Sequence, residues 1–116
     1  MRAIVAQPVE GATAEIAFDP DHYPPMPPTD GNRALLARLN GVNRDLGLAE
    51  MPELDPGMRG AGDISFVAAD VDGLVGLGAA SSGDHTPNEA VDIPSIFTQA
   101  KRAAILMSRL AAERRR

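Results

Sequence analysis

The stretch DIPSIFTQAKRAAILMSRL, residues 92–110, carries the clearest structural signal in the chain. Asp92 can cap a helix at its start, and Pro94 falls in the first turn, where a proline is tolerated because its missing N–H would have no partner. Apolar residues then recur at helical spacing. We expect one buried stripe made of Ile96, Ala100, Ala103, Met107 and Leu110. The stretch therefore predicts a long amphipathic helix.

A second helix is predicted upstream, between a cap at Asp30 and a stop at Gly47. Its apolar positions also have helical spacing and are Leu35, Leu36, Leu39, Val42 and Leu46. Glycine punctuates the chain between the two helices. There, residues 63–69 fit either a helix or a strand, and periodicity alone does not distinguish the two. Residues 74–77 are typical of a short apolar strand.

Residues 12–18 alternate in the period of a half-buried strand, with Ala12, Ala14, Ile16 and Phe18 on one side. Residues 19–31 are rich in proline, which removes backbone donors and fixes dihedral angles. This segment therefore predicts an extended connector and a boundary. Strands and helices are therefore both expected along the chain.

Composition excludes several classes of protein. The 116 residues make one domain's worth of chain, and 44% are apolar. The formal charge of -5 argues against nucleic acid as a partner, since phosphate binding needs a basic face. The basic run at residues 114–116 is read as a solvated helix end, with a phosphate or membrane contact as the alternative. No cysteine, signal peptide or membrane span is found, which predicts a soluble protein.

The glycine-rich residues 73–83 raise the question of a nucleotide site. Gly78 and Gly83 have the separation found in a phosphate-binding loop, but Asp84 stands where that loop needs lysine, and its carboxylate would repel phosphate. The dinucleotide fingerprint also fails, because no third glycine follows Gly76 and Gly78 at the required spacing. Neither kind of nucleotide binding is expected.

Only two histidines occur, His22 and His85. His85 lies in the polar loop SGDHTPNE, residues 82–89. An imidazole on such a loop can bind a metal ion, although a lone loop histidine is more often a solvated side chain. A catalytic zinc needs about three protein ligands, and no other residue here has ligand spacing to His85. The residues by themselves leave both interpretations open.

An ordered set of motifs favours the first interpretation. It comprises RGAGDISFV at 59–67, DGL at 72–74, GLG at 76–78, GDHTPNE at 83–89, VDI at 91–93 and KRAA at 101–104. In this order they resemble the C-terminal region of the zinc peptidase family that includes glutamate carboxypeptidase, acetylornithine deacetylase, succinyl-diaminopimelate desuccinylase and aminoacylase. The resemblance runs from about Gly11 to Leu110.

The resemblance implies a fold and a metal site. It places residues 1–18 at the end of a lid domain, which often makes a homodimer, and residues 19–116 in the last part of a catalytic α/β domain whose sheet is flanked by helices. It also implies two zinc ions in the full-length protein, with His85 a ligand to one of them.

The resemblance further places Gly62 and Asp63 beside the substrate, where a loop entering a helix can present backbone amides to a carboxylate. Gly62 replaces the serine or threonine of many members, and Tyr23 replaces an arginine that some members carry before the prolines. For Asp63 the alternative is a helix cap or a buried structural carboxylate.

The resemblance also implies that the remaining zinc ligands and the general base lie upstream of Met1. We therefore expect a cytoplasmic fragment of a metallo-exopeptidase or amino-acid deacylase that is inactive alone. Its full-length form would cleave a peptide or N-acyl amino acid at an amide bond next to a free carboxylate. The alternative is a stand-alone, non-catalytic interaction module derived from the same fold.

Overall fold

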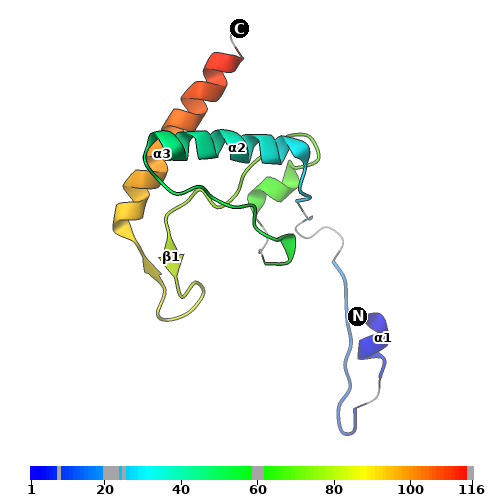
Figure 1. Cartoon of the computed structure of the whole chain (residues 1–116). Helices are drawn as coiled ribbons and strands as arrows, with labels where there is room; N and C mark the ends of the chain where they lie inside the picture. Colours follow the sequence, from blue (N-terminus) through cyan, green and yellow to red (C-terminus); the bar gives the residue numbers. More distant parts are fainter. Residues whose placement is uncertain (8, 20–23, 25, 59–61, 115–116) are drawn as a thin grey trace.

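The computed structural model describes residues 1–7, 9–19, 24, 26–58 and 62–114. Three helices, two single 3-10 turns and two short strands follow one another along these residues (Figure 1). In chain order they are α1 (Arg2–Val5), α2 (Asp30–Asp45), η1 (Pro56–Met58), η2 (Asp63–Phe66), β1 (Ser81–Ser82), β2 (Ala90–Val91) and α3 (Ile93–Glu113). The architecture is thus mixed helix and strand, compatible with part of an α/β fold.

The predicted helix α2 is confirmed, but its cap lies one residue earlier than expected. The Thr29 hydroxyl accepts the Asn32 backbone N–H at 3.0 Å, so Thr29 rather than Asp30 is the N-cap. At the other end Gly47 takes a positive φ of 68°. The Leu48 N–H reaches the Asn43 carbonyl at 2.8 Å, which closes the helix in a Schellman motif.

Helix α3 is also confirmed, with Asp92 at its N-cap and proline in its first turn. The predicted buried stripe is wrong in part. Ile96 is 45% exposed and Met107 is 63% exposed, whereas Arg102 and Leu106 are the buried residues of the helix. The cause is that α3 carries apolar residues on two sides, and α2 covers only one of them.

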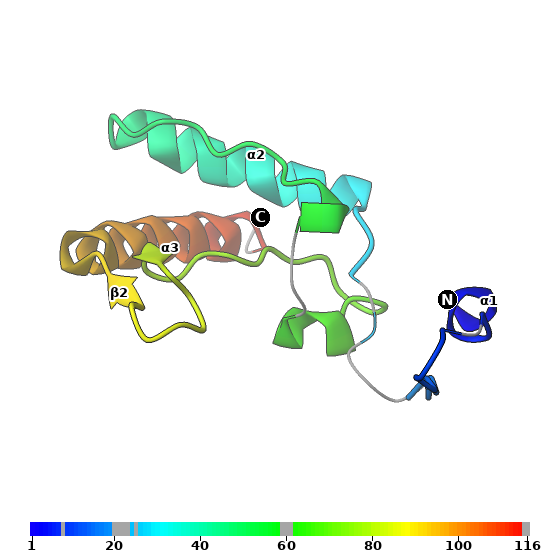
Figure 2. The ribbon, with the colours of Figure 1, turned by 90° about the horizontal axis from the view of Figure 1, so that it is seen from below.

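The core lies where α2 and α3 pack against each other as two layers (Figure 2). Its buried apolar side chains are Leu39, Val42 and Leu106. Two ion pairs join α2 to α3 at the surface, Arg38 with Glu113 at 3.0 Å and Asp45 with Arg109 at 2.6 Å. These exposed pairs contribute little to stability, so the small apolar core carries most of the packing energy.

Neither strand expected from the sequence is paired with another strand among the described residues. Residues 13–19 make no ladder, and Val9 with Ala12 forms only an isolated bridge. Residues 74–77 are also unpaired, although Leu74 and Leu77 pack against the core. A strand needs a neighbouring strand to satisfy its backbone groups, and none lies beside either segment in this part of the chain. The sheet that does form pairs Ser81 with Val91 and Ser82 with Ala90.

The chain is more expanded than a compact domain of its size. Its radius of gyration is 19.3 Å, against about 13 Å expected for this length. Residues 1–7 and 9–19 form an arm that lies away from α2 and α3 in Figure 1, with Arg2 stacked 4.8 Å from the centre of the Phe18 ring. The predicted connector falls partly on residues 20–23 and 25, outside the described residues. The assignment of residues 1–18 to a lid domain stays a prediction.

Candidate functional site

The predicted metal ligand His85 lies in the loop that joins β1 to β2. Its side chain is exposed, as expected for a loop residue, and its backbone takes a φ of 63°, in the left-handed region. A residue other than glycine rarely adopts this conformation, and histidine is one of the side chains that tolerates it best. The turn therefore holds the imidazole out into solvent.

Hydrogen bonds within the turn fix the position of His85. The Thr86 hydroxyl donates to the Gly83 carbonyl at 2.6 Å, and the Thr86 N–H donates to the same carbonyl at 3.1 Å. Gly83 has a φ of 66°, and a Cβ at this position would lie 2.9 Å from the Asn88 carbonyl oxygen. Glycine is therefore required at residue 83 for both conformation and space.

The two predicted substrate contacts lie at the start of η2. Gly62 has extended backbone angles, and its carbonyl accepts the Ser65 N–H at 2.9 Å. Asp63 follows in the first turn and is exposed, so it is not a buried structural carboxylate. A Cβ at residue 62 would lie 3.2 Å from the Val75 side chain, which leaves little room there for a larger residue.

The structure does not bring these three residues into one cluster. The turn at 63–66 and the hairpin that carries His85 lie at different places in Figures 1 and 2. Among the described residues, no group of three or more histidine, cysteine, aspartate or glutamate side chains could hold a metal ion. The described residues thus contain no complete metal site, and the role of His85 as a ligand stays a prediction. His22, Tyr23 and residues 59–61 of the motif set fall outside the described part of the chain.

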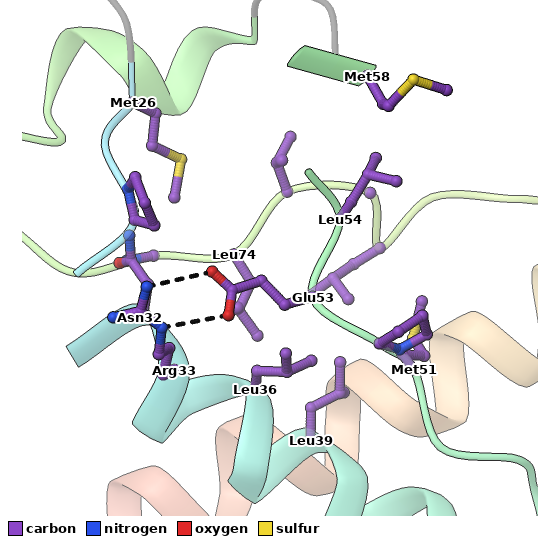
Figure 3. A pocket seen from close by; sticks show the side chains of 16 residues that line it. Met26, Asn32, Arg33, Leu36, Leu39, Met51, Glu53, Leu54, Met58 and Leu74 are labelled. Atoms are coloured by element: carbon purple, nitrogen blue, oxygen red, sulfur yellow. Dashed lines mark hydrogen bonds and ion pairs between the residues drawn. The ribbon is translucent and has the colours of Figure 1, made fainter. Parts of the chain in front are cut away.

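A pocket that was not predicted from the sequence lies under the N-terminal half of α2 (Figure 3). Its volume is about 540 Å³. Most of its wall is apolar, and the lining side chains labelled in Figure 3 are Met26, Asn32, Arg33, Leu36, Leu39, Met51, Glu53, Leu54, Met58 and Leu74. His85 does not line it, so the histidine is not at the mouth of this pocket.

One ion pair supplies the charge at the pocket wall. The Arg33 guanidinium donates to both carboxylate oxygens of Glu53, at 3.1 and 3.4 Å, and to Asp30 at 3.2 Å. The hydrogen bond and charge of Glu53, followed by those of Asp30, raise the pKa of Arg33 above its ordinary value. The guanidinium of Arg33 is therefore charged at neutral pH, as is usual for arginine.

Asparagine side chains tie the pocket walls to α2. Asn40 donates to the Met51 carbonyl at 2.9 Å and accepts the Met51 N–H at 2.8 Å. Asn32 accepts the Gly73 N–H at 2.9 Å. The walls come from segments far apart in sequence, so local periodicity does not predict the pocket. Asn32 and Asn40 are a weak sequence signal, because an asparagine within a helix often bonds to backbone groups.

Comparison with known proteins shows which class of protein this chain belongs to. Residues 3–109 match the model of a family of peptidases, which are hydrolases of amide bonds. The chain belongs to peptidase family M20/M25/M40. No curated protein and no solved structure matches it. Members of this family are generally metal-dependent. No helix in the described residues has both the length and the apolar character needed to cross a membrane.

Proposed function

We propose that this chain is part of a zinc-dependent exopeptidase or amino-acid deacylase that cleaves an amide bond next to a free carboxylate. Membership of peptidase family M20/M25/M40 over residues 3–109 carries the proposal. The substrate would be a small peptide or an N-acyl amino acid. A bound zinc ion in such an enzyme lowers the pKa of its water to ~7 and so supplies a nucleophile at neutral pH.

In this proposal His85 is one zinc ligand, and Gly62 with Asp63 lies beside the substrate. The exposed imidazole supports the first role, because a ligand shared with another part of a protein has to be accessible. The hydrogen-bonded turn around Thr86 supports it as well, because a ligand on a fixed backbone loses less entropy on binding metal. The other ligands and the general base come from protein outside this chain.

The test compares two forms of the protein. One is the chain of residues 1–116, and the other is the gene product with all sequence that precedes Met1 in the same reading frame. Hydrolysis of N-acyl amino acids and dipeptides is measured with added zinc or cobalt. We expect no activity from residues 1–116 and zinc-dependent activity from the longer product. Activity of residues 1–116 that a chelator abolishes would show that a general base lies within the chain, and Glu89 and Asp63 would be the first residues to replace.

A non-catalytic interaction module is the second candidate function. The expanded shape and the exposed apolar side chains of α3 favour it, since both offer surface to a partner. The sequence immediately upstream of Met1 in the source DNA separates the two proposals. A reading frame that continues into a His-x-Asp motif supports the enzyme, and an in-frame stop followed by a ribosome-binding site supports the module.

A further inference from the structure

Asp72 is bound to the N-terminal end of α2, although it lies 43 residues from Thr29 in sequence. The Thr29 hydroxyl donates to the Asp72 carboxylate at 2.7 Å and accepts the Asn32 N–H at 3.0 Å. The same carboxylate packs directly on Gly31, where a Cβ would lie 1.9 Å from the nearest carboxylate oxygen. A negative charge at the start of a helix is also favoured by the helix dipole. Hydrogen bonding, charge and close packing thus all hold Asp72 on α2.

The next residue along the chain is joined to α2 as well. The Gly73 N–H donates to the Asn32 side chain at 2.9 Å, and Gly73 is buried. Residues 72 and 73 are therefore bonded to two different side chains at the start of α2. Neither bond belongs to a regular helix or strand, so the position of this segment depends on the side chains that hold it.

The segment that follows Asp72 packs in turn on η2. A Cβ at Gly73 would lie 2.5 Å from the Ile64 side chain, so Ile64 occupies the space that a larger residue at 73 would need. A Cβ at Gly62 would lie 3.2 Å from the Val75 side chain. Residues 62 and 64 therefore lie directly against residues 75 and 73.

Backbone hydrogen bonds also connect Gly62 to the region of Asp72. The Ser65 N–H donates to the Gly62 carbonyl at 2.9 Å, and the Val71 N–H donates to the Val67 carbonyl at 3.0 Å. Hydrogen-bonded turns thus lead from Gly62 to the residue before Asp72. A movement of Asp72 away from α2 would therefore move the turn that begins at Gly62.

We propose that Asp72 is a positioning residue for Gly62 and Asp63, and that Thr29 and Gly31 form the surface of α2 that holds it. This inference rests on the proposed function, in which Gly62 and Asp63 lie beside the substrate. Asp72 acts through η2 and does not touch the substrate. Such an effect is large in an enzyme, because a displacement of about 1 Å can lower the rate roughly 100-fold.

Amide hydrogen exchange of residues 1–116, followed by NMR, tests whether Asp72 holds the turn. Gly31→Ala puts a methyl group where the Asp72 carboxylate lies, whereas Gly41→Ala adds the same group to the same helix, where the nearest side-chain atom is 3.8 Å away. We expect Gly31→Ala and Asp72→Ala to speed exchange of the Ser65 N–H by about tenfold or more. Gly41→Ala should not change it, and the amides of the α2–α3 core should stay protected in all variants. Unchanged exchange of Ser65 in Gly31→Ala and Asp72→Ala would overturn the proposal.

The effect on the substrate is measured with the gene product that includes all sequence upstream of Met1. Asp72→Ala should raise the KM for an N-acyl amino acid by about fivefold or more and leave bound zinc unchanged, because the displaced residues face the substrate. Asp72→Asn keeps an oxygen that can accept the Thr29 hydroxyl, and it should restore most of the affinity. Gly31→Ala should add little to the effect of Asp72→Ala, since both remove one contact.

A KM that Asp72→Ala leaves unchanged would overturn the positioning role, and so would an equal loss of affinity in Asp72→Asn. Failure of the proposed function has a different result, namely an unmodified gene product that hydrolyses no N-acyl amino acid or dipeptide. In that case the exchange of the Ser65 N–H still decides whether Asp72 holds the turn.

Discussion

At the scale of single residues, polar side chains position the segments that have no regular structure. Asn40 is the clearest case, because one side-chain amide makes hydrogen bonds to both the carbonyl and the N–H of Met51. The hydroxyl of Thr29 acts similarly, since it caps α2 and donates to Asp72 at 2.7 Å. Gly31 allows this approach, because a Cβ there would lie 1.9 Å from the Asp72 carboxylate.

Replacing Asn40 should therefore lower the free energy of unfolding more than the loss of an ordinary surface side chain would. Asn40→Ala leaves the Met51 N–H and carbonyl without their partner, and we expect the free energy of unfolding to fall by about 1–3 kcal/mol. Urea unfolding followed by circular dichroism measures the change. Asn88→Ala, in the exposed hairpin loop, is the control and should change stability by less than about 0.5 kcal/mol. Equal effects of the two substitutions would mean that the Met51 contact is not formed in solution.

Some features of His85 could be predicted from the sequence and others could not. The loop position and exposure of His85 followed from the polar residues around it. Its positive φ did not, because left-handed histidine has no signature in sequence. Whether Gly62 and Asp63 lie near it in the working enzyme depends on segments that pack between them, so the roles of all three as site residues stay predictions.

At the scale of elements, the two long helices α2 and α3 were predicted, the short helix α1 was not, and neither predicted strand was confirmed. A helix satisfies its own hydrogen bonds, so spacing and end signals such as Pro94 and Gly47 are enough to locate it. A strand takes its partners from elsewhere, and residues 12–18 and 74–77 have none among the described residues. The buried side of α3 was misassigned for a related reason, since periodicity cannot rank two apolar faces. The pocket could not be predicted because its walls meet only after folding.

The end of α2 gives a matched pair of glycine substitutions. Gly47→Ala places a side chain at a φ of 68° and should lower the free energy of unfolding by about 1–2 kcal/mol. Gly41→Ala lies inside the same helix, where a Cβ would meet only Arg44 at 3.8 Å, and should raise it by about 0.5–1 kcal/mol. Thermal or urea unfolding of the two variants checks both signs. Stabilisation by Gly47→Ala would contradict the Schellman end of α2.

At the scale of the whole molecule, a small core supports a large exposed surface. Three buried apolar side chains hold α2 to α3, and none of the described residues of the arm, 1–7 and 9–19, belongs to this core. The predicted α/β class holds in the coarse sense of mixed helices and a small sheet. A helix-flanked catalytic sheet requires strands beyond those described, so the assignment of residues 19–116 to part of a catalytic domain stays a prediction.

The central claim is that His85 binds the metal ion of an amide hydrolase. The most direct test is to express the gene product with all its upstream sequence, as the unmodified protein, as His85→Ala and as Val71→Ala, whose side chain is exposed and lies outside the motifs of the resemblance. Bound zinc and the rate of N-acyl amino acid hydrolysis are then measured for each. We predict that His85→Ala loses both zinc and at least about 99% of the activity, while Val71→Ala keeps them. Full zinc content and activity in His85→Ala would contradict the claim.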